Sequence, residues 1–347
     1  MKHRAVFVVL SCVLASAVAV PQAAADGCGW TARDLPLPAG AEWAYTTSSS
    51  DDNRLILGSI LTDAGRRGVV WRDGELVEMA APPAGIKHVY VNDVNNNGVV
   101  VGDVFIDEGG TPATRAFRYE NGQYEVFPGR SWERSTATLV NDAGDVVGTV
   151  FGGMFVRTVF WRSDWARPTI EGETMPVGLS ADRTKLVVKD ANSYPVTGSV
   201  VDLATGESAP LPDEMPALVA DNDRILYSGQ GNTIVERDFD GKQVATYEDG
   251  VAAYGKNNTG TVLGRTAGGE TVLWRNGVRE QLRSDKLLNP SHHGDVTDDG
   301  VLIGTYSDGE GTTHPARWFC AWRTALSLRS WAVAPPSSNS ARFAAVK

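Results

Sequence analysis

Asp93, Asn95 and Asn97 give this sequence its clearest candidate for a metal site. They alternate through residues 93–98, which read Asp-Val-Asn-Asn-Asn-Gly and fit the first half of a D-x-[DN]-x-[DN]-G calcium loop. Alternate side-chain oxygens of such a loop converge on a hard cation around a sharp glycine turn. The twelfth position, which normally supplies a bidentate Glu, is Val104. An ordinary Asn/Asp/Gly hairpin turn gives the same pattern, so the sequence allows either no cofactor or a calcium ion.

A second group of candidates consists of His88, His292, His293 and Asp295. Imidazoles that share a pocket can bind zinc or transfer protons, and a carboxylate beside them could take part in polysaccharide hydrolysis. Lone surface histidines and clustered turn aspartates produce the same sequence. The chain contains no G-x-S-x-G, H-E-x-x-H, phosphate-loop or C-x-x-C motif, so we assign no catalytic residue.

The elements that must position these residues come from a repeat. A short aliphatic run that closes on an anchor residue, usually a small one, recurs every 36 to 46 residues, a spacing typical of four-stranded propeller blades. The closing residues are Gly58, Gly102, Gly148, Val188, Ser228, Gly264 and Gly304. We therefore expect an all-β protein, a β-propeller of seven four-stranded blades. Because Val188 is a weak anchor, six and eight blades stay open. The histidines lie where innermost strands should begin, so we expect them at the mouth of the central channel.

Each copy has the same order of elements. A short run leads into a polar turn and the aliphatic run, and a third run ends near an aromatic residue before a two-residue turn and a fourth strand. The aromatic residues are Trp71, Tyr119, Trp161, Trp274 and Trp318, and the turns are Asp73-Gly74, Asn121-Gly122, Thr205-Gly206, Asp240-Gly241 and Asn276-Gly277. Asn-Gly and Asp-Gly favour type I′ hairpins. The aromatic residues should fill the space between blades.

The two ends of the repeat region complement each other. The last copy has no turn or fourth strand after Trp318, and residues 30–38 resemble the fourth strands of other copies. We expect this N-terminal strand to complete the last blade. Cys28 precedes the strand, and Cys320 stands where the turn would begin. A Cys28–Cys320 disulfide in place of the hairpin is therefore predicted, with two free thiols as the alternative.

Both ends of the chain lie outside the repeat. Residues 1–25 have the basic start, the apolar run and the Ala-x-Ala end of a secretory signal peptide. The apolar run is shorter than a membrane-spanning helix requires. We therefore expect a secreted, extracellular protein, cleaved near Ala25, with a propeller over residues 26–322 and a C-terminal segment with a flexible tail over residues 323–347.

The net charge of the chain limits the classes of partner that we expect. The chain has 32 Lys and Arg against 42 Asp and Glu, which gives a formal net charge of −10 at pH 7. An acidic surface without basic runs disfavours nucleic acid and anionic membranes as partners. We expect a monomer whose partner is an extracellular ligand, glycan or protein.

The repeats resemble the HAF-repeat family of bacterial extracellular proteins, whose units combine an Asn-Asp-x-Gly-x-Val-Val-Gly core with a His-Ala-Phe-x-Trp strand and an Asn-Gly turn. Residues 141–148 match the core closely, and residues 257–264 and 95–102 match it less strictly. The His-Ala-Phe element survives only in part, as Ala116-Phe117 and as His314 near Ala316. The resemblance covers most of residues 45–320 and implies a secreted β-propeller, without catalytic residues.

These observations favour a non-catalytic binding module that holds its ligand at one end of the central channel, where loops of all blades converge. The alternative is an extracellular polysaccharide hydrolase or lyase with an Asp/His cluster at the channel mouth. A third possibility is a purely structural component of the cell envelope. Two carboxylates that face each other across a pocket at about 5 to 9.5 Å would favour the enzyme.

Overall fold

The computed structural model describes residues 29–321 apart from residues 51, 154, 162–171, 181, 183, 194–195, 213–214, 221–222, 229–230 and 290–293. All regular secondary structure within these residues is β-strand. None of them belongs to a helix with the length and apolar composition that crossing a membrane requires. The expected signal peptide and C-terminal segment lie outside the described residues, so cleavage near Ala25 stays a prediction.

The strands form seven antiparallel sheets, numbered as blades 1 to 7. Blade 1 consists of β2 (Trp43–Ser49), β3 (Leu55–Thr62), β4 (Gly65–Arg72) and β5 (Glu75–Glu78); blade 2 of β6 (Ile86–Val94), β7 (Val100–Glu108), β8 (Thr111–Glu120) and β9 (Gln123–Val126); blade 3 of β10 (Glu133–Val140), β11 (Val146–Gly152) and β12 (Phe155–Trp161). Blade 4 consists of β13 (Thr174–Leu179), β14 (Lys185–Asp190), β15 (Gly198–Asp202) and β16 (Ser208–Pro210); blade 5 of β17 (Met215–Ala220), β18 (Arg224–Ser228), β19 (Thr233–Asp238) and β20 (Gln243–Glu248). Blade 6 consists of β21 (Gly250–Lys256), β22 (Thr261–Thr266), β23 (Thr271–Arg275) and β24 (Val278–Gln281); blade 7 of β25 (Asp295–Val296), β26 (Leu302–Ser307), β27 (Thr313–Ala321) and β1 (Gly29–Asp34).

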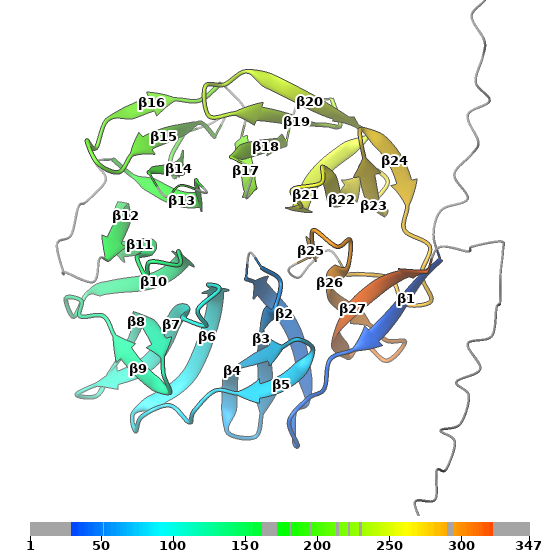
Figure 1. Cartoon of the computed structure of the whole chain (residues 1–347). Helices are drawn as coiled ribbons and strands as arrows, with labels where there is room; N and C mark the ends of the chain where they lie inside the picture. Colours follow the sequence, from blue (N-terminus) through cyan, green and yellow to red (C-terminus); the bar gives the residue numbers. More distant parts are fainter. Residues whose placement is uncertain are drawn as a thin grey trace, which may run out of the picture.

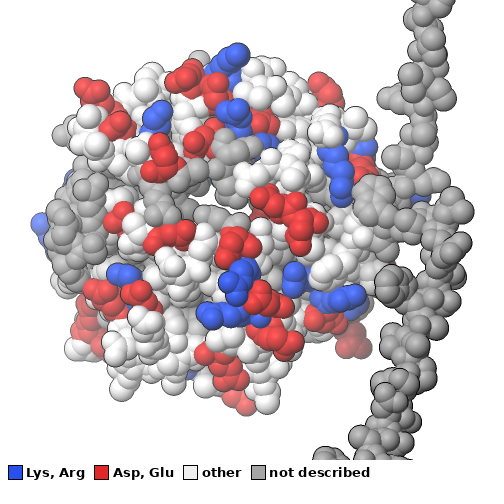
Figure 2. Space-filling view, in the orientation of Figure 1, with Lys and Arg blue, Asp and Glu red and all other residues white. Residues whose placement is uncertain are grey.

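The seven sheets are arranged around a central opening as a β-propeller (Figure 1). The predicted fold class and the number of blades are therefore confirmed. Six sheets have four strands, and blade 3 has three within the described residues, where residues 162–171 follow β12. Basic side chains stand among acidic ones over the face that Figure 2 shows, as the mixed composition without charge runs predicts.

The first described strand lies beside the last. β1 pairs antiparallel with β27, which places Trp30 opposite Cys320 and Asp34 opposite Ala316. The side chain of Trp30 is only 3% exposed and belongs to the apolar cluster around Trp318. The N-terminal segment therefore supplies the outer strand of blade 7. Cys28 lies outside the described residues, so its disulfide with Cys320 stays a prediction.

A β-bulge in the innermost strand explains the anchor residue of the repeat. In blade 3, Ala137 pairs with Gly148 and Leu139 pairs with Val147, so Thr138 is left unpaired. A Cβ atom on Gly148 would lie 2.0 Å from the carbonyl oxygen of Thr136 and 2.8 Å from the ring of Trp161. A Cβ atom on Gly58, Gly102 or Gly264 would likewise clash with a carbonyl oxygen of the innermost strand and with an aromatic ring of the third strand. In blade 5 the residue opposite the bulge is Tyr227, one position before the expected anchor Ser228.

The third-strand tryptophans lie in the core between blades, as predicted. Trp71, Trp274 and Trp318 are completely buried. Trp71 packs with Ile303 of blade 7, and Trp274 packs with residues of blade 5. Blade 2 departs from the prediction, because Phe117 is its fully buried aromatic residue and Tyr119 is only partly buried. Phe117 is the residue directly opposite Gly102, so its ring takes the space above the glycine.

The polar turn of the repeat joins neighbouring blades. Asn95 donates from Nδ2 to the carbonyl oxygen of Asn141 at 2.7 Å. Asn96 donates from its backbone N and its Nδ2 to the carboxylate of Asp142, at 2.9 and 2.8 Å. Residues 257–258 make the same bonds to residues 297–298. At these two junctions, the polar turn of the repeat is therefore a hydrogen-bonded link from one blade to the next.

Three of the five predicted two-residue turns are confirmed as type I′ hairpins. Both central residues have positive φ at Asp73-Gly74, Asn121-Gly122 and Asn276-Gly277. At Thr205-Gly206 and Asp240-Gly241 only the glycine has a positive φ. An Asp earlier in each loop, Asp202 or Asp238, accepts backbone N–H groups of the turn, and this Asx geometry produces a longer loop.

Candidate ligand-binding site

Within the described residues, six of the seven blades have a bulge beside the anchor position that leaves one residue of the innermost strand out of the strand pairing. The unpaired residues are Thr47, Asn92, Thr138, Val177, Ala217 and Tyr254. Asn92, Thr138, Val177 and Tyr254 line a cavity of about 440 Å³ to which all seven innermost strands contribute. Bulges often re-aim side chains in this way beside binding sites. In these six blades the repeat therefore provides one position that the strand pairing does not need.

Asp93 and Asp295 line this central cavity, and both carboxylates are engaged with the protein. Asp93 accepts the hydroxyl of Ser48 at 2.7 Å and the backbone N–H of Val140 at 2.8 Å. Asp295 accepts the hydroxyl of Ser49 and the N–H of its own neighbour at 2.8 Å. Each carboxylate therefore links its blade to another. These bonds give both carboxylates a structural role in joining the blades.

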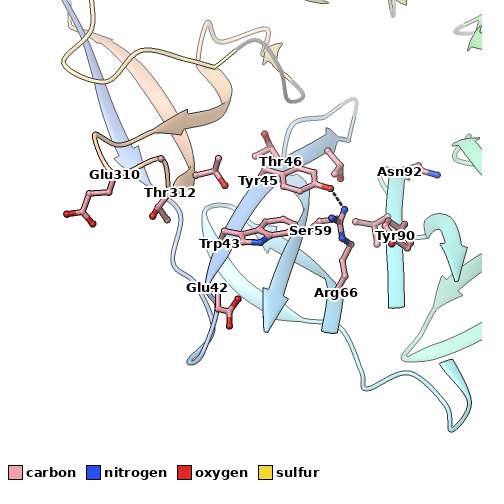
Figure 3. Close-up of a pocket in the computed structure, with 14 residues that line it drawn as sticks. Glu42, Trp43, Tyr45, Thr46, Ser59, Arg66, Tyr90, Asn92, Glu310 and Thr312 are labelled. Carbon is pink, nitrogen blue, oxygen red and sulfur yellow. Dashed lines mark hydrogen bonds between the residues drawn. The ribbon is translucent and has the colours of Figure 1, made fainter. Parts of the chain in front are cut away.

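A larger cavity, of about 880 Å³, opens where blades 7, 1 and 2 meet (Figure 3). We call it the aromatic pocket. It is lined by Glu42, Trp43, Tyr45, Thr46, Thr47, Ser59, Arg66, Tyr90, Val91, Asn92, Glu310, Gly311, Thr312 and Thr313. Trp43 and Tyr45 are two residues apart in β2 and therefore share one face of the strand. Thr46 faces the other side, where it is completely buried and bonds to Thr305 of blade 7.

Arg66 lies among three aromatic rings of the aromatic pocket (Figure 3). The rings of Trp43 and Tyr45 stack with centroids 5.2 Å apart. The guanidinium carbon of Arg66 is 4.9 Å from the centroid of Trp43 and 4.7 Å from that of Tyr90, and Nη1 donates to the hydroxyl of Tyr45 at 2.6 Å. Within the described part of the chain, Arg66 forms no ion pair. Its charge is therefore held in place by rings and left without a carboxylate.

Polar groups complete the lining. The Oγ1 atom of Thr47, the bulge residue of blade 1, is buried and has no hydrogen-bond partner among the described residues. Asn92 donates from Nδ2 to Thr136 Oγ1 at 3.1 Å and to the Ala137 carbonyl at 2.8 Å, so blade 3 fixes its orientation. Behind Asn92, burial raises the pKa of Asp103, which accepts a hydrogen bond from Thr136 at 2.8 Å. The pocket thus presents oriented acceptors and donors beside apolar rings.

The wall contributed by blade 7 is the hairpin between β26 and β27. Asp308 Oδ2 lies 2.9 Å from His314 Nε2, and this hydrogen bond lowers the pKa of Asp308. The imidazole of His314 stacks on Tyr306 with centroids 5.0 Å apart. Lys286 donates to the Tyr306 hydroxyl at 2.7 Å and to Asp34 at 2.8 Å. This chain of contacts holds the hairpin at the edge of the pocket.

The structure separates the histidine candidates that the sequence suggested. His88 lies behind the aromatic pocket, where its Nδ1 accepts the backbone N–H of Arg66 at 3.3 Å and its ring lies 6.4 Å from that of Tyr90. Asp295 lies on the central cavity. His292 and His293 lie outside the described residues. Among the residues that are described, no group of three or more His, Cys, Asp or Glu side chains is placed to hold a metal ion.

The three residues of the expected calcium loop have separate partners. Asn95 Oδ1 accepts the N–H groups of Asn97 and Val99, at 3.1 and 2.9 Å. Asn97 Nδ2 donates to the Asp142 carbonyl at 2.8 Å, and Asp93 bonds to Ser48. These bonds account for the loop as a turn and an inter-blade link. Calcium binding stays a prediction, which a titration of the purified protein tests.

Sequence reasoning did not select Trp43, Tyr45, Arg66 and Tyr90. Trp43 and Tyr45 lie at the start of β2, Arg66 lies beside the hairpin between β3 and β4, and Tyr90 lies in the middle of β6. The available signal was their departure from the repeat, because Trp43 and Tyr45 place two rings on one face of a strand for which the repeat requires no aromatic residue. Residues that a repeat does not need for folding are free to bind a ligand.

Comparisons with known proteins support the fold. No family model matches the chain, and its sequence matches no curated protein. Among solved structures, an oligogalacturonate lyase in complex with manganese superposes with a TM-score of 0.58 at 10% identity, over 84% of this chain and 93% of the lyase. The Dos1 propeller has a TM-score of 0.49 at 10% identity, over 77% of this chain and 76% of its own. A gluconolactonase from Xanthomonas campestris has a TM-score of 0.44 at 16% identity, over 83% of this chain and 88% of its own. At 10% identity, the likeness to the lyase extends to the fold alone.

Proposed function

We propose that this protein is a secreted, non-catalytic propeller that binds a glycan in the aromatic pocket. The observation that carries the proposal is the arrangement of Trp43, Tyr45 and Tyr90 around the guanidinium of Arg66, which forms no ion pair among the described residues. A sugar ring has an apolar face, which packs on aromatic side chains, and a rim of hydroxyl groups, which needs hydrogen-bond partners. The oriented amide of Asn92 and the buried hydroxyl of Thr47 suit that rim.

The volume and shape of the pocket support a small unit of a glycan as the ligand. About 880 Å³ falls within the range of pockets that enclose most of a small ligand. Glu42 and Glu310 also line the pocket and are exposed, so their carboxylates can accept hydrogen bonds from hydroxyl groups of the sugar. The HAF-repeat resemblance, which implies an extracellular protein, agrees with a glycan partner.

The enzymatic alternative, a polysaccharide hydrolase or lyase, draws on the lyase among the structural neighbours. That protein is named for oligogalacturonate, and at 10% identity the likeness extends to the fold alone. The engaged carboxylates of Asp93 and Asp295 do not supply a free acid and base in the channel. Chromatography of the same glycans after long incubation with the protein decides between the two functions, because an enzyme releases shortened products and a binding module returns the glycan intact.

The test of binding is isothermal titration calorimetry of residues 26–347 with cello-, xylo- and galacturonate oligosaccharides. Trp43→Ala and Arg66→Gln should each weaken binding of the best ligand about tenfold, since each removes a ring contact or a charge-assisted donor worth about 1.5 kcal/mol. Val278→Ala is the matched control, because Val278 is 64% exposed on blade 6. If no oligosaccharide binds, or if both pocket variants bind like the wild type, the proposed function is wrong.

A further inference from the structure

Blade 3 carries a second exposed aromatic group. Trp132 immediately precedes β10 and is 52% exposed. Its ring meets that of Phe155 edge to face, with centroids 5.7 Å apart at 89°. The repeat does not require this exposure, because Trp71 and Trp274 are completely buried between blades. Trp132 and Phe155 therefore form a pair of adjoining aromatic rings at the surface of blade 3.

Arginines frame the two rings. The guanidinium of Arg130 lies 5.6 Å from the ring centroid of Trp132, and that of Arg157 lies 4.3 Å from the centroid of Phe155. Glu133 is paired weakly with Arg130, at 3.9 Å, and its Oε2 already accepts a backbone N–H. Arg157 has no ion pair among the described residues. The group is therefore locally cationic on a chain whose net charge is −10, which complements an acidic ligand.

The second group lies at the same end of the ring as the aromatic pocket. Trp43 begins β2 and pairs with Leu61, beside the hairpin that carries Arg66. Glu133 begins β10 and pairs with Gly152, beside the hairpin that carries Phe155. Since innermost strands of successive blades run in the same direction around the axis, these equivalent positions face the same side.

Blade 2 lies between the two sites and connects them. It supplies Tyr90 to the aromatic pocket. The ring centroid of His88 lies 6.4 Å from that of Tyr90 and 6.1 Å from that of Phe105. Arg115 of the same blade, which is 1% exposed, donates to the carbonyl oxygens of Arg130 and Glu133. The segment that carries Trp132 is thus anchored to blade 2 by a buried guanidinium, so the two sites are held in a fixed relation.

We propose that Trp132, Phe155, Arg130 and Arg157 form a second subsite, which binds an acidic sugar unit of the glycan chain held in the aromatic pocket. This inference rests on the proposed function and adds that the ligand is an acidic polysaccharide that spans blades 1 to 3. A chain that occupies both sites gains affinity from the high effective concentration of its second unit, by a factor of about 10² or more in favourable geometry. A fragment that reaches only the aromatic pocket gains nothing.

The test is calorimetry of the intact protein with digalacturonate and polygalacturonate as probes. Trp132→Ala and Arg157→Gln should weaken polygalacturonate binding about tenfold and leave digalacturonate binding unchanged. Methyl-esterified polygalacturonate, which lacks the negative charges, should lose most of the affinity by which the polymer exceeds digalacturonate. Val278→Ala, exposed on blade 6, should change neither affinity. Trp43→Ala should weaken both probes. Acrylamide quenching gives a second readout, because polygalacturonate should shield Trp132 in the wild type.

Two results separate this inference from the proposed function. If Trp43→Ala weakens both probes while Trp132→Ala and Arg157→Gln bind polygalacturonate within twofold of the wild type, the second subsite is refuted and the aromatic pocket stands. If Trp43→Ala binds digalacturonate like the wild type, the proposed function fails. Equal affinity of the wild type for both probes also overturns the second subsite, because an occupied second subsite must raise the affinity for the longer chain.

Discussion

Trp30→Ala tests whether the strand at the start of the described chain holds the ring together. Trp30 is 3% exposed, lies opposite Cys320 in the register of β1 and β27, and packs in the cluster that contains Trp318. Its backbone N–H also donates to the Arg283 carbonyl at 3.0 Å, a bond that the substitution keeps. The loss is therefore that of a buried indole, with a cavity left between blades 6 and 7.

The expected magnitude follows from this burial. Truncation of a buried Trp to Ala typically costs about 3–5 kcal/mol of unfolding free energy, a large share of the roughly 5–15 kcal/mol that keeps a protein folded. Trp132→Ala is the matched control, since Trp132 is 52% exposed and a surface substitution changes stability by about 0.5 kcal/mol or less. Both variants remove one indole, so they differ only in where the ring lies.

Urea unfolding followed by circular dichroism measures both variants under the same conditions. We expect the Trp30→Ala midpoint to fall well below that of Trp132→Ala, which should coincide with the wild type. If the two variants unfold at the same urea concentration, β1 does not contribute to the stability of blade 7, and the account of how the two ends of the ring meet is refuted.

The remaining predictions concern a glycine, a buried carboxylate and a disulfide. Gly148→Ala would place Cβ 2.0 Å from a carbonyl oxygen of β10. We expect it to lower the unfolding free energy by at least about 1–3 kcal/mol, measured by urea unfolding. Gly309→Ala is the control, because its Cβ would meet nothing within 4 Å and should change stability by less than about 1 kcal/mol. Burial raises the pKa of Asp103, so its ionisation costs the folded state stability as the pH rises above the ordinary carboxyl range. Asp103→Asn should therefore raise the thermal midpoint at neutral pH, and the difference should disappear at acidic pH, where Asp103 is protonated in both the folded and the unfolded state. Reduction of the predicted Cys28–Cys320 disulfide should lower the unfolding free energy by up to about 5 kcal/mol, measured as a shift of the urea midpoint with dithiothreitol.

Each of these predictions has a result that contradicts it. Equal stability of the two glycine variants would show that the bulge does not crowd Gly148. A stabilisation by Asp103→Asn that persists at acidic pH would show that the effect does not come from the charge. Cys320→Ser supplies the control for the disulfide, because its urea midpoint should not respond to dithiothreitol. If the wild-type urea midpoint does not respond to dithiothreitol either, the predicted disulfide is wrong.

The sequence predicted the propeller because folding requirements repeat in every blade. Position 148 requires a glycine because a bulged backbone and an aromatic ring both lie where a Cβ atom would be. Position 95 favours Asn because its side chain bonds both to its own turn and to the neighbouring blade. Such requirements return at a fixed spacing and are visible without coordinates. Where the glycine is absent, as in blade 5, the spacing alone placed the anchor one residue away from Tyr227.

The aromatic pocket was beyond prediction because its residues meet only once. Trp43, Arg66 and Tyr90 come from β2, β4 and β6, and nothing in the repeat fixes which ring stands beside which guanidinium. The acidic turn residues attracted notice because Asp and His carry familiar chemistry. Yet Asp93, a candidate calcium ligand, links its own blade to two others, so these hydrogen bonds of its carboxylate serve the assembly of the ring.

The most direct test of the central claim is a crystal structure of the protein with a bound galacturonate oligosaccharide. The account predicts density for a sugar ring against Trp43, with a carboxylate or hydroxyl group of the sugar on the guanidinium of Arg66 and a further polar contact to Asn92. Density for the sugar in the central cavity, beside Asp93 and Asp295, with the aromatic pocket empty, would contradict it.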